Sequence, residues 1–187
     1  MKLNKRRDLR LLFNTNAPHS NSGYSVEMRD VLYRLAQDGW PVAVSAFYGV
    51  QGGPTDVSYP EDLNPKLKGV KIKHYPMMGD GFGSDAMFYH SIDFKANAAF
   101  CMQDIWTLDP AFLSKMKVWI PWLPIDKDPL PPNTLEKLRY AYKIMSFSKF
   151  GHDLLEKNGF VSTFIVEGTD TDIFTPLDQA ESRKKMG

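Results

Sequence analysis

The chain has a single cysteine and no long hydrophobic run, and these two absences limit what it can be. Cys101 alone cannot support a disulfide framework, so we expect a reducing, cytoplasmic setting. No apolar stretch approaches the roughly 20 residues that a membrane-spanning helix needs. The apolar run that follows the basic start is too short for the core of a signal peptide. The basic cluster Lys5-Arg6-Arg7 could make at most a peripheral contact with anionic lipid.

An excess of charge of one sign is also lacking. The chain has 23 Lys and Arg residues against 22 Asp and Glu residues, which leaves a formal net charge of +1. Balanced charge produces no general field that would attract a nucleic acid, so we expect no nucleic-acid partner. The hydrophobic content of 43% and the aromatic content of 13% predict a folded core. A chain of 187 residues fits one ordinary domain.

Three familiar kinds of site are missing as well. The four histidines are scattered along the chain, and neither a metal-ligand spacing nor a Ser-His-Asp order emerges, so we expect no metal and no cofactor. The G-x-G-x-x-G fingerprint is absent, and the apolar run at residues 42–47 does not end in an acidic residue. A nicotinamide oxidoreductase is therefore disfavoured.

Apolar runs alternate with helical patterns along the chain. Tyr24, Met28 and Leu35 belong to one apolar helix face, which Ser22 would cap at its start and Gly39 would end. Further helices are expected from Ser84 to about residue 97, from a capping box at residues 133–136 through residue 142, and from a Ser148 cap to residues 158–159. Strands are expected at residues 9–14, 42–47, 70–75, 98–102, 118–125, 144–147 and 164–166.

This alternation predicts an α/β fold with a doubly wound, mostly parallel, Rossmann-like sheet. Residues 49–68 carry Gly and Pro clusters with little periodicity and are expected to form a long loop. Two prolines, Pro121 and Pro124, each remove a ladder donor. We therefore expect the strand at 118–125 to end, or to lie at an edge of the sheet, near Pro121.

Ligands of an open parallel sheet bind at the carboxyl ends of its strands, so the residues that follow each strand are the candidates. Gly23, between Ser22 and Tyr24, would let a ligand approach the backbone at a helix N-terminus, where an anion is favoured. The alternative is a turn glycine that leads into a helix cap. Ser148 and Lys149 offer a hydroxyl and a positive charge at a second helix start, or again only a cap.

The carboxyl ends of three later strands carry acidic side chains. Asp104 follows the strand at 98–102 and could accept a proton, or it could be an ordinary loop acid. Asp126 would face the cleft, or would form an Asx turn before Pro129. Glu167 is either a cleft residue or a hinge residue.

The last part of the chain supports a family resemblance. Residues 146–150 read SFSKF and residues 164–176 read FIVEGTDTDIFTP. This pair, at this separation, resembles the N-terminal half of the family 4 (group 1) glycosyltransferases. The resemblance implies a GT-B enzyme with two facing Rossmann-like domains, which transfers a sugar with retention and without a metal. Residues 1–176 would be the N-terminal, acceptor-side domain, and residues 177–187 would begin the linker to a C-terminal, donor-binding domain.

The resemblance also implies roles for individual residues. Asp104 would be catalytic, at a point where many relatives place a histidine, and Trp106 would stack on a sugar face unless it belongs to the core. His19 lies in a cleft loop, where the alternative is a solvated histidine. Expected donor-binding residues are Ser22, Gly23, Tyr24, Ser148, Lys149 and Glu167. Expected acceptor-binding residues are Asn16, His19, Trp106 and Asp126.

The expected partners are a nucleotide-sugar donor, a sugar, lipid or protein acceptor, and the C-terminal GT-B domain. We expect residues 1–187 alone to be inactive, because the closed cleft that orients donor and acceptor cannot form. Two alternatives remain open. One is a stand-alone module that binds a glycan or a nucleotide, and the other is a different GT-B enzyme such as a nucleotide-sugar epimerase.

Overall fold

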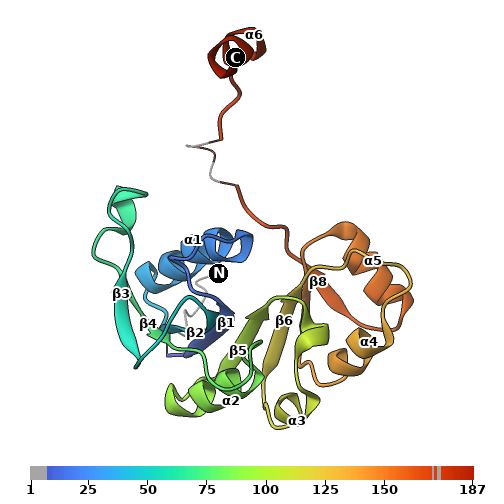
Figure 1. The fold of residues 1–187 in the computed structure, drawn as a ribbon. Coiled ribbons are helices and arrows are strands. Elements are labelled where there is room, and N and C mark those ends of the chain that lie inside the picture. Colours follow the sequence, from blue (N-terminus) through green and yellow to red (C-terminus); the bar gives the residue numbers. More distant parts are fainter. Residues whose placement is uncertain (1–7, 170, 172–173) are drawn as a thin grey trace, which may run out of the picture.

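The computed structural model describes residues 8–169, 171 and 174–187, which form an α/β fold around one eight-stranded sheet (Figure 1). The strand order is β3-β4-β2-β1-β5-β6-β7-β8. The edge strand β3 pairs antiparallel with β4, and the other pairings in the described sheet are parallel. The predicted fold class, a mostly parallel Rossmann-like sheet, is confirmed.

The elements follow the predicted alternation. The strands are β1 (Leu11–Asn16), β2 (Val42–Tyr48), β3 (Thr55–Ser58), β4 (Lys71–Tyr75), β5 (Ala98–Met102), β6 (Trp119–Leu123), β7 (Ile144–Ser146) and β8 (Ser162–Phe164). The α-helices are α1 (Gly23–Gln37), α2 (Ser84–Asp93), α3 (Pro110–Leu113), α4 (Pro132–Leu138), α5 (Lys149–Lys157) and α6 (Gln179–Met186). Short 3₁₀ helices cover Pro65–Leu67 and Ile105–Thr107. None of the helices in the described part of the chain is long and apolar enough to cross a membrane.

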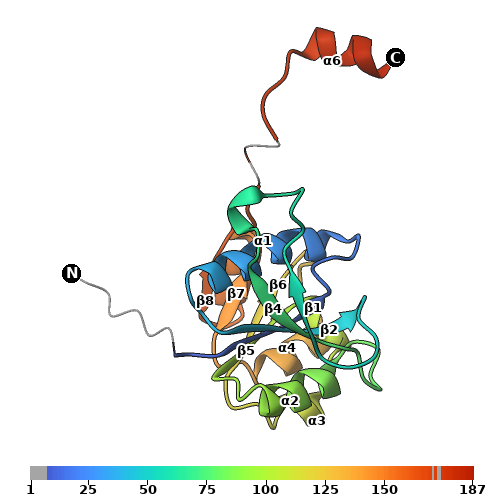
Figure 2. The same cartoon turned by 90° about the vertical axis from the view of Figure 1, so that its left-hand side faces the viewer.

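Both faces of the sheet are covered, as a doubly wound fold requires. Met28 and Leu32 of α1 pack with Phe13 and Val44 on one face. The neighbouring strand residues point the other way. On that second face, residues from four helices join one cluster around the buried Trp119: Met87 of α2, Leu113 of α3, Leu138 of α4, and Leu154 and Leu155 of α5. Figure 2 shows α1 on one side of the sheet and α2, α3 and α4 on the other.

The ends of α1 are those that the sequence predicts. Ser22 caps the helix, because its Oγ accepts a hydrogen bond from the N–H of Ser25 (3.1 Å). At the other end Gly39 adopts a left-handed φ of +91°, which a residue without Cβ adopts at little cost. Because these signals are local, the sequence alone places the helix correctly.

The predicted loop at residues 49–68 is wrong in part. It contains β3 and the 3₁₀ helix at Pro65–Leu67. Long-range contacts order this segment: the hydroxyl of Tyr33 donates to the carbonyl of Val57 (2.9 Å), and the hydroxyl of Tyr59 donates to Asp30 (2.8 Å). No local periodicity signals such contacts.

Two predicted helix starts also need correction. Gly83, with φ +76°, precedes α2 in place of Ser84, whose Oγ instead accepts a hydrogen bond from the N–H of Asp109 (2.9 Å). This helix ends at Asp93 rather than near residue 97. The predicted capping box at residues 133–136 does not form, because α4 begins at Pro132 without a side-chain cap, and it ends at Leu138 rather than at residue 142.

Pro121 lies in an interior strand, contrary to prediction. The N–H of Tyr142 donates to the carbonyl of Trp119 (2.8 Å), so alternate residues 119, 121 and 123 direct their backbone groups toward β7. The ladder between β6 and β7 begins only at Trp122. The missing donor of Pro121 therefore falls between this hydrogen bond and the first pair of that ladder, at the amino end of the β6–β7 contact.

The last strand is shifted and more open than predicted. It spans Ser162–Phe164 rather than residues 164–166. Phe164 is 43% exposed and none of the three residues of the strand is buried, whereas the sequence predicts a buried strand. The later part of the family-like segment, Asp170, Asp172 and Ile173, lies outside the described residues, as does the cluster Lys5-Arg6-Arg7. The helix α6 has no buried residue and is drawn apart from the sheet in Figures 1 and 2.

Candidate functional site

A hollow of about 1060 Å³ lies where the strands end at their carboxyl termini. Its wall combines the end of β1, the first turn of α1, the exits of β6 and β7, and the segment after β8. We call it the main hollow. Five of the predicted site residues line it, namely Asn16, Ser22, Gly23, Tyr24 and Glu167.

The first turn of α1 forms one side of the main hollow. Ser22 serves as the helix cap and also accepts a hydrogen bond from the side-chain amide of Asn16 (2.7 Å). A Cβ atom added to Gly23 would meet nothing within 4 Å, so this glycine leaves open space beside the helix N-terminus. The N-terminus of α1 therefore borders the hollow, and a helix N-terminus favours an anion.

Tyr24 connects the main hollow electrostatically with the acidic side chains around it. Burial, with a smaller effect of the nearby carboxylates of Asp104, Glu167 and Asp126, raises the pKa of Tyr24 to about 12. The phenol is therefore neutral at physiological pH and can donate a hydrogen bond to a ligand.

A second, smaller hollow of about 330 Å³, the acidic hollow, shares Pro124 with the main hollow. It is lined by Asp104, Trp106, Asp126 and Lys127 together with apolar residues of the β6 exit. The indole of Trp106 is 53% exposed, so this residue does not belong to the core. The structure thus brings together three predicted residues that are up to 22 positions apart in the sequence.

The carboxyl group of Asp104 has a perturbed pKa. Burial raises this pKa, the negative charge of Asp126 raises it further, and a hydrogen bond with Trp106 lowers it in part. A carboxylate whose pKa is raised holds a proton more readily than an ordinary aspartate, which suits a group that accepts protons.

The exit of β8 is fixed by one hydrogen bond to α1 and one to β6. The N–H of Gly168 donates to Oε1 of Glu27 (3.0 Å), and the indole N–H of Trp122 donates to the carbonyl of Ile165 (3.1 Å). Burial raises the pKa of Glu167, and the charge of Glu27 adds to this effect. Glu27, Phe147 and Pro124 also line the main hollow, although the sequence analysis did not select them.

Two predicted donor-binding residues do not line either hollow. Ser148 caps α5, because its Oγ accepts a hydrogen bond from the N–H of Gly151 (3.0 Å). The exposed Lys149 forms an ion pair with Asp153. The expectation that Ser148 caps a helix is confirmed. A role of Ser148 or Lys149 in donor binding stays a prediction.

His19 lies in the predicted loop but outside both hollows. A ring nitrogen of His19 lies 3.0 Å from the carbonyl of Gly49, and its ring stacks on that of His74 at 5.7 Å. His74 is fully buried, and within the described structure neither of its ring nitrogens has a hydrogen-bond partner. Burial lowers the pKa of His74 to about 4, and His19 adds a smaller effect. A histidine inside a strand pattern gives no sequence signal of this environment.

A buried amide pair that the sequence analysis missed holds the glycine-rich loop at residues 77–83. The amide of Asn14 donates to the carbonyls of Ser45 (3.1 Å) and Gly83 (3.4 Å), and Gln103 donates to Oδ1 of Asn14 and to the carbonyl of Phe82. A Cβ atom on Gly83 would lie 2.8 Å from Nδ2 of Asn14. The sequence does contain a signal for this pair, because Asn14 is a polar residue that ends an apolar run and Gln103 directly follows a predicted strand.

Among the described residues, one group of side chains is close enough to hold a metal ion. Ligand atoms of His152, Asp153 and Glu156 lie within 4.8 Å of one another on α5. Asp153 already pairs with Lys149, and Nδ1 of His152 lies 2.7 Å from Oγ of Ser162. This group is separate from both hollows, and exposed acidic groups of this kind are common without a metal.

No known family model and no curated protein matches the sequence. Among solved structures, sucrose-phosphate synthase from Thermosynechococcus elongatus matches over 95% of this chain with a TM-score of 0.60 and a sequence identity of 11%. The match covers 52% of that enzyme's chain, so this chain spans about half its length. At this identity the likeness concerns the fold alone. The chain therefore shares the α/β fold of about half of sucrose-phosphate synthase.

Proposed function

We propose that this chain is the N-terminal, acceptor-side half of a retaining glycosyltransferase with a GT-B fold, which moves a sugar from a nucleotide-sugar to an acceptor. One observation carries this proposal: the main hollow and the acidic hollow adjoin each other at the carboxyl ends of the strands, where ligands of such sheets bind. The likeness to half of a sucrose-phosphate synthase supports the same reading.

The main hollow suits the donor. The N-terminus of α1 favours a phosphate, the open space beside Gly23 lets it approach the backbone, and the neutral phenol of Tyr24 supplies a further donor. Glu167 on the opposite side would accept hydrogen bonds from ribose or sugar hydroxyls.

The acidic hollow suits the acceptor. The exposed face of Trp106 can pack against the C–H groups of a sugar ring, while the carboxylates of Asp104 and Asp126 accept hydrogen bonds from its hydroxyls. Asp104 would also take the proton of the attacking hydroxyl, and its raised pKa favours that role. Because the two hollows share Pro124, the bound acceptor would lie beside the donor.

In this proposal residues 1–176 form one domain, and residues 177–187 lead toward a second domain that supplies most donor contacts. A chain that holds only one wall of the cleft cannot fix the two reactants relative to each other. Residues 1–187 alone should therefore bind a nucleotide-sugar weakly and transfer no sugar.

The acceptor site can be tested by saturation-transfer NMR with free glucose, on the wild-type chain and on Trp106→Ala. The signal should disappear in Trp106→Ala and persist in the control Tyr142→Ala, which removes a ring that is 63% exposed and lines neither hollow. An equal signal from all three proteins would contradict the proposed acceptor site.

A glycan-binding module without catalysis is the second candidate, and the exposed Trp106 beside two carboxylates favours it. The discriminating experiment is transfer from UDP-glucose by a longer form of the protein that includes the residues after Gly187. Transfer that Asp104→Asn abolishes supports the enzyme, whereas sugar binding without transfer in that longer form supports the module.

A further inference from the structure

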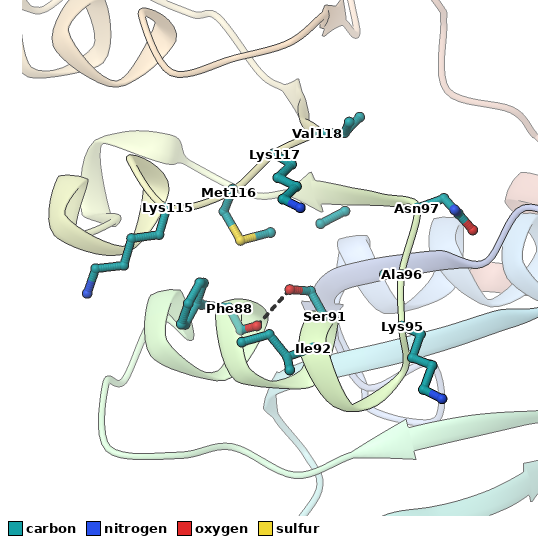
Figure 3. A pocket seen from close by; sticks show the side chains of 11 residues that line it. Phe88, Ser91, Ile92, Lys95, Ala96, Asn97, Lys115, Met116, Lys117 and Val118 are labelled. Carbon is teal, nitrogen blue, oxygen red and sulfur yellow. Dashed lines mark hydrogen bonds between the residues drawn. The ribbon is translucent and has the colours of Figure 1, made fainter.

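A third hollow, of about 560 Å³, lies at the opposite edge of the sheet from the proposed cleft. It is formed by the second half of α2, the turn into β5 and the connection from α3 to β6 (Figure 3). Asn97 and Val118 line it, and each directly precedes a strand. The hollow therefore lies at the amino ends of β5 and β6, separated from the proposed cleft by the length of these strands. We call it the amino-edge hollow.

The floor of the amino-edge hollow is apolar. Phe88 and Ile92 of α2 form one side, with Met116 on the other (Figure 3). Ile92 is 59% exposed, so its side chain is accessible to a ligand in the hollow. The volume lies within the range of about 300 to 1,000 Å³ that is typical of small-molecule pockets.

The rim of the hollow is cationic and carries no acidic side chain. Its charged residues are Lys95, Lys115 and Lys117, and within the described residues none of the three forms an ion pair. Figure 3 shows the ammonium group of Lys117 over the middle of the hollow, with Lys95 and Lys115 extending at opposite ends. The Nζ atom of Lys115 also lies 5.7 Å from the ring centroid of Phe88.

The backbone at Lys95 ends α2 in a left-handed C-cap of the Schellman type. Lys95 has a φ of +52°, the one positive φ of a residue other than glycine among the described residues. The turn is held by hydrogen bonds from the N–H groups of Lys95 and Ala96 to the carbonyls of Ile92 (3.1 Å) and Ser91 (2.8 Å). A left-handed residue with a Cβ costs about 1 kcal/mol that glycine or asparagine would largely avoid. A lysine at this position therefore accepts strain while placing a charge on the rim.

We propose that the amino-edge hollow binds an amphipathic phosphate ester: an anionic group held by Lys117, with Lys95 or Lys115, and an apolar body that rests on Phe88, Ile92 and Met116. Lysine is a strong partner for phosphate because its ammonium group is a compact, mobile point charge. Neither inorganic phosphate nor a neutral apolar molecule would satisfy both the rim and the floor. The same chemistry occurs in soluble aryl or alkyl phosphates and in the headgroup region of anionic lipids.

The test uses 1-naphthyl phosphate as the probe, with 1-naphthol and inorganic phosphate as its two halves, and measures dissociation constants by ligand-observed NMR. The whole probe should bind the wild-type chain more tightly than either half. Lys117→Gln and Ile92→Ser should each weaken it about fivefold, the loss of a contact worth about 1 kcal/mol. The matched control is Lys143→Gln, the same charge change at the amino end of β7 but outside the hollow, and it should change the constant by less than about twofold.

Thermal unfolding midpoints equal to that of the wild type establish that each variant is folded. Equal binding of 1-naphthol and 1-naphthyl phosphate would overturn the proposal, as would equal weakening by Lys117→Gln and Lys143→Gln. Sedimentation with vesicles of phosphatidylcholine and phosphatidylserine separates the two sources of ligand. Co-sedimentation that 1-naphthyl phosphate abolishes identifies a lipid headgroup, and binding of the probe without co-sedimentation identifies a soluble phosphate ester.

Discussion

The two edges of the same sheet are chemically opposite. At the carboxyl ends of the strands, Asp104, Asp126 and Glu167 lie close enough to Tyr24 to add to the rise in its pKa that burial causes. At the amino ends, Lys95 and Lys117 flank an apolar hollow that contains no acidic side chain. The formal net charge of +1 averages over both edges and hides each of them. For this chain, the charge near each end of the strands is therefore more informative than the total charge.

The largest effect should come from the carboxyl edge, where the backbone is tightly constrained. Gly83→Ala would place a Cβ atom 2.8 Å from Nδ2 of Asn14 and 2.9 Å from Cβ of Phe47, at a φ of +76°. We expect a loss of about 3 kcal/mol in the free energy of unfolding, measured with urea, because the clash adds to the strain of a left-handed residue.

The matched control for this substitution is Gly69→Ala. Gly69 has nearly the same φ, +78°, but its added Cβ atom would meet nothing within 4 Å. It should cost about 1 kcal/mol, the strain alone. Equal losses for the two variants would show that the Asn14 contact does not constrain the loop.

The second effect is the dependence of stability on pH near the carboxyl end of β4. The pKa of His74 is about 4 in the folded chain, below the unfolded value of about 6.5. The unfolded chain therefore binds more protons between these two values, and stability must fall as the pH falls through 6.5 toward 4. Between pH 7 and pH 5 His74 should account for a loss of about 2 kcal/mol.

Urea unfolding of the wild type and of His74→Leu at both pH values measures this contribution. The loss between pH 7 and pH 5 should be smaller by about 2 kcal/mol in His74→Leu. Burial also lowers the pKa of His90, so a residual dependence in the variant is expected. An unchanged loss would mean that His74 is hydrated rather than isolated in the folded chain.

A smaller effect tests the pairing of the two carboxylates in the acidic hollow. Asp126→Asn should lower the pKa of Asp104, because it removes the negative charge that helps to raise it. Burial is the larger cause, so the pKa should stay above the usual aspartate value. Side-chain carboxyl NMR during a pH titration measures the pKa of Asp104 in both proteins. An unaltered pKa would show that the charge of Asp126 does not act on Asp104.

The smallest effects are changes in the free energy of unfolding when one charge is removed at each edge of the sheet. Asp104→Asn should stabilise the chain by no more than about 0.5 kcal/mol at neutral pH, because the partly exposed carboxylate is screened by water. Lys117→Gln should leave the free energy of unfolding unchanged within about 0.5 kcal/mol, because its ammonium group forms no ion pair with any residue that the structure describes. A clear loss of stability in Lys117→Gln would assign this lysine a structural role.

Sequence patterns predict the parts of this molecule that depend on local signals. The Ser22 cap, the left-handed Gly39 and the apolar strands can each be recognised from a few neighbouring residues. Tyr24 and Asp104 are found because ligands of a parallel sheet bind at the carboxyl ends of its strands, and both residues line a hollow there. The strand β3 could not be found in this way, because it depends on Tyr33 and Tyr59 reaching across from α1 and the neighbouring loop.

The remaining misses have the same physical origin. Pro121 is tolerated inside the sheet only because of where the β6–β7 ladder begins, and that register is a property of two strands. His74 looks like any strand residue until its neighbours remove it from water. Lys95 and Lys117 are 22 positions apart and resemble ordinary surface lysines until the fold brings them to one hollow.

The most direct test of the proposed function is to map where UDP-glucose binds the chain by amide NMR. The account predicts shifts that cluster at Gly23, Tyr24 and Glu167, with a dissociation constant weaker than micromolar because one wall of the cleft is present. Micromolar or tighter binding, or shifts confined to Lys117 and Ile92 at the other edge, would contradict the assignment of the carboxyl edge as the donor-binding wall of a glycosyltransferase.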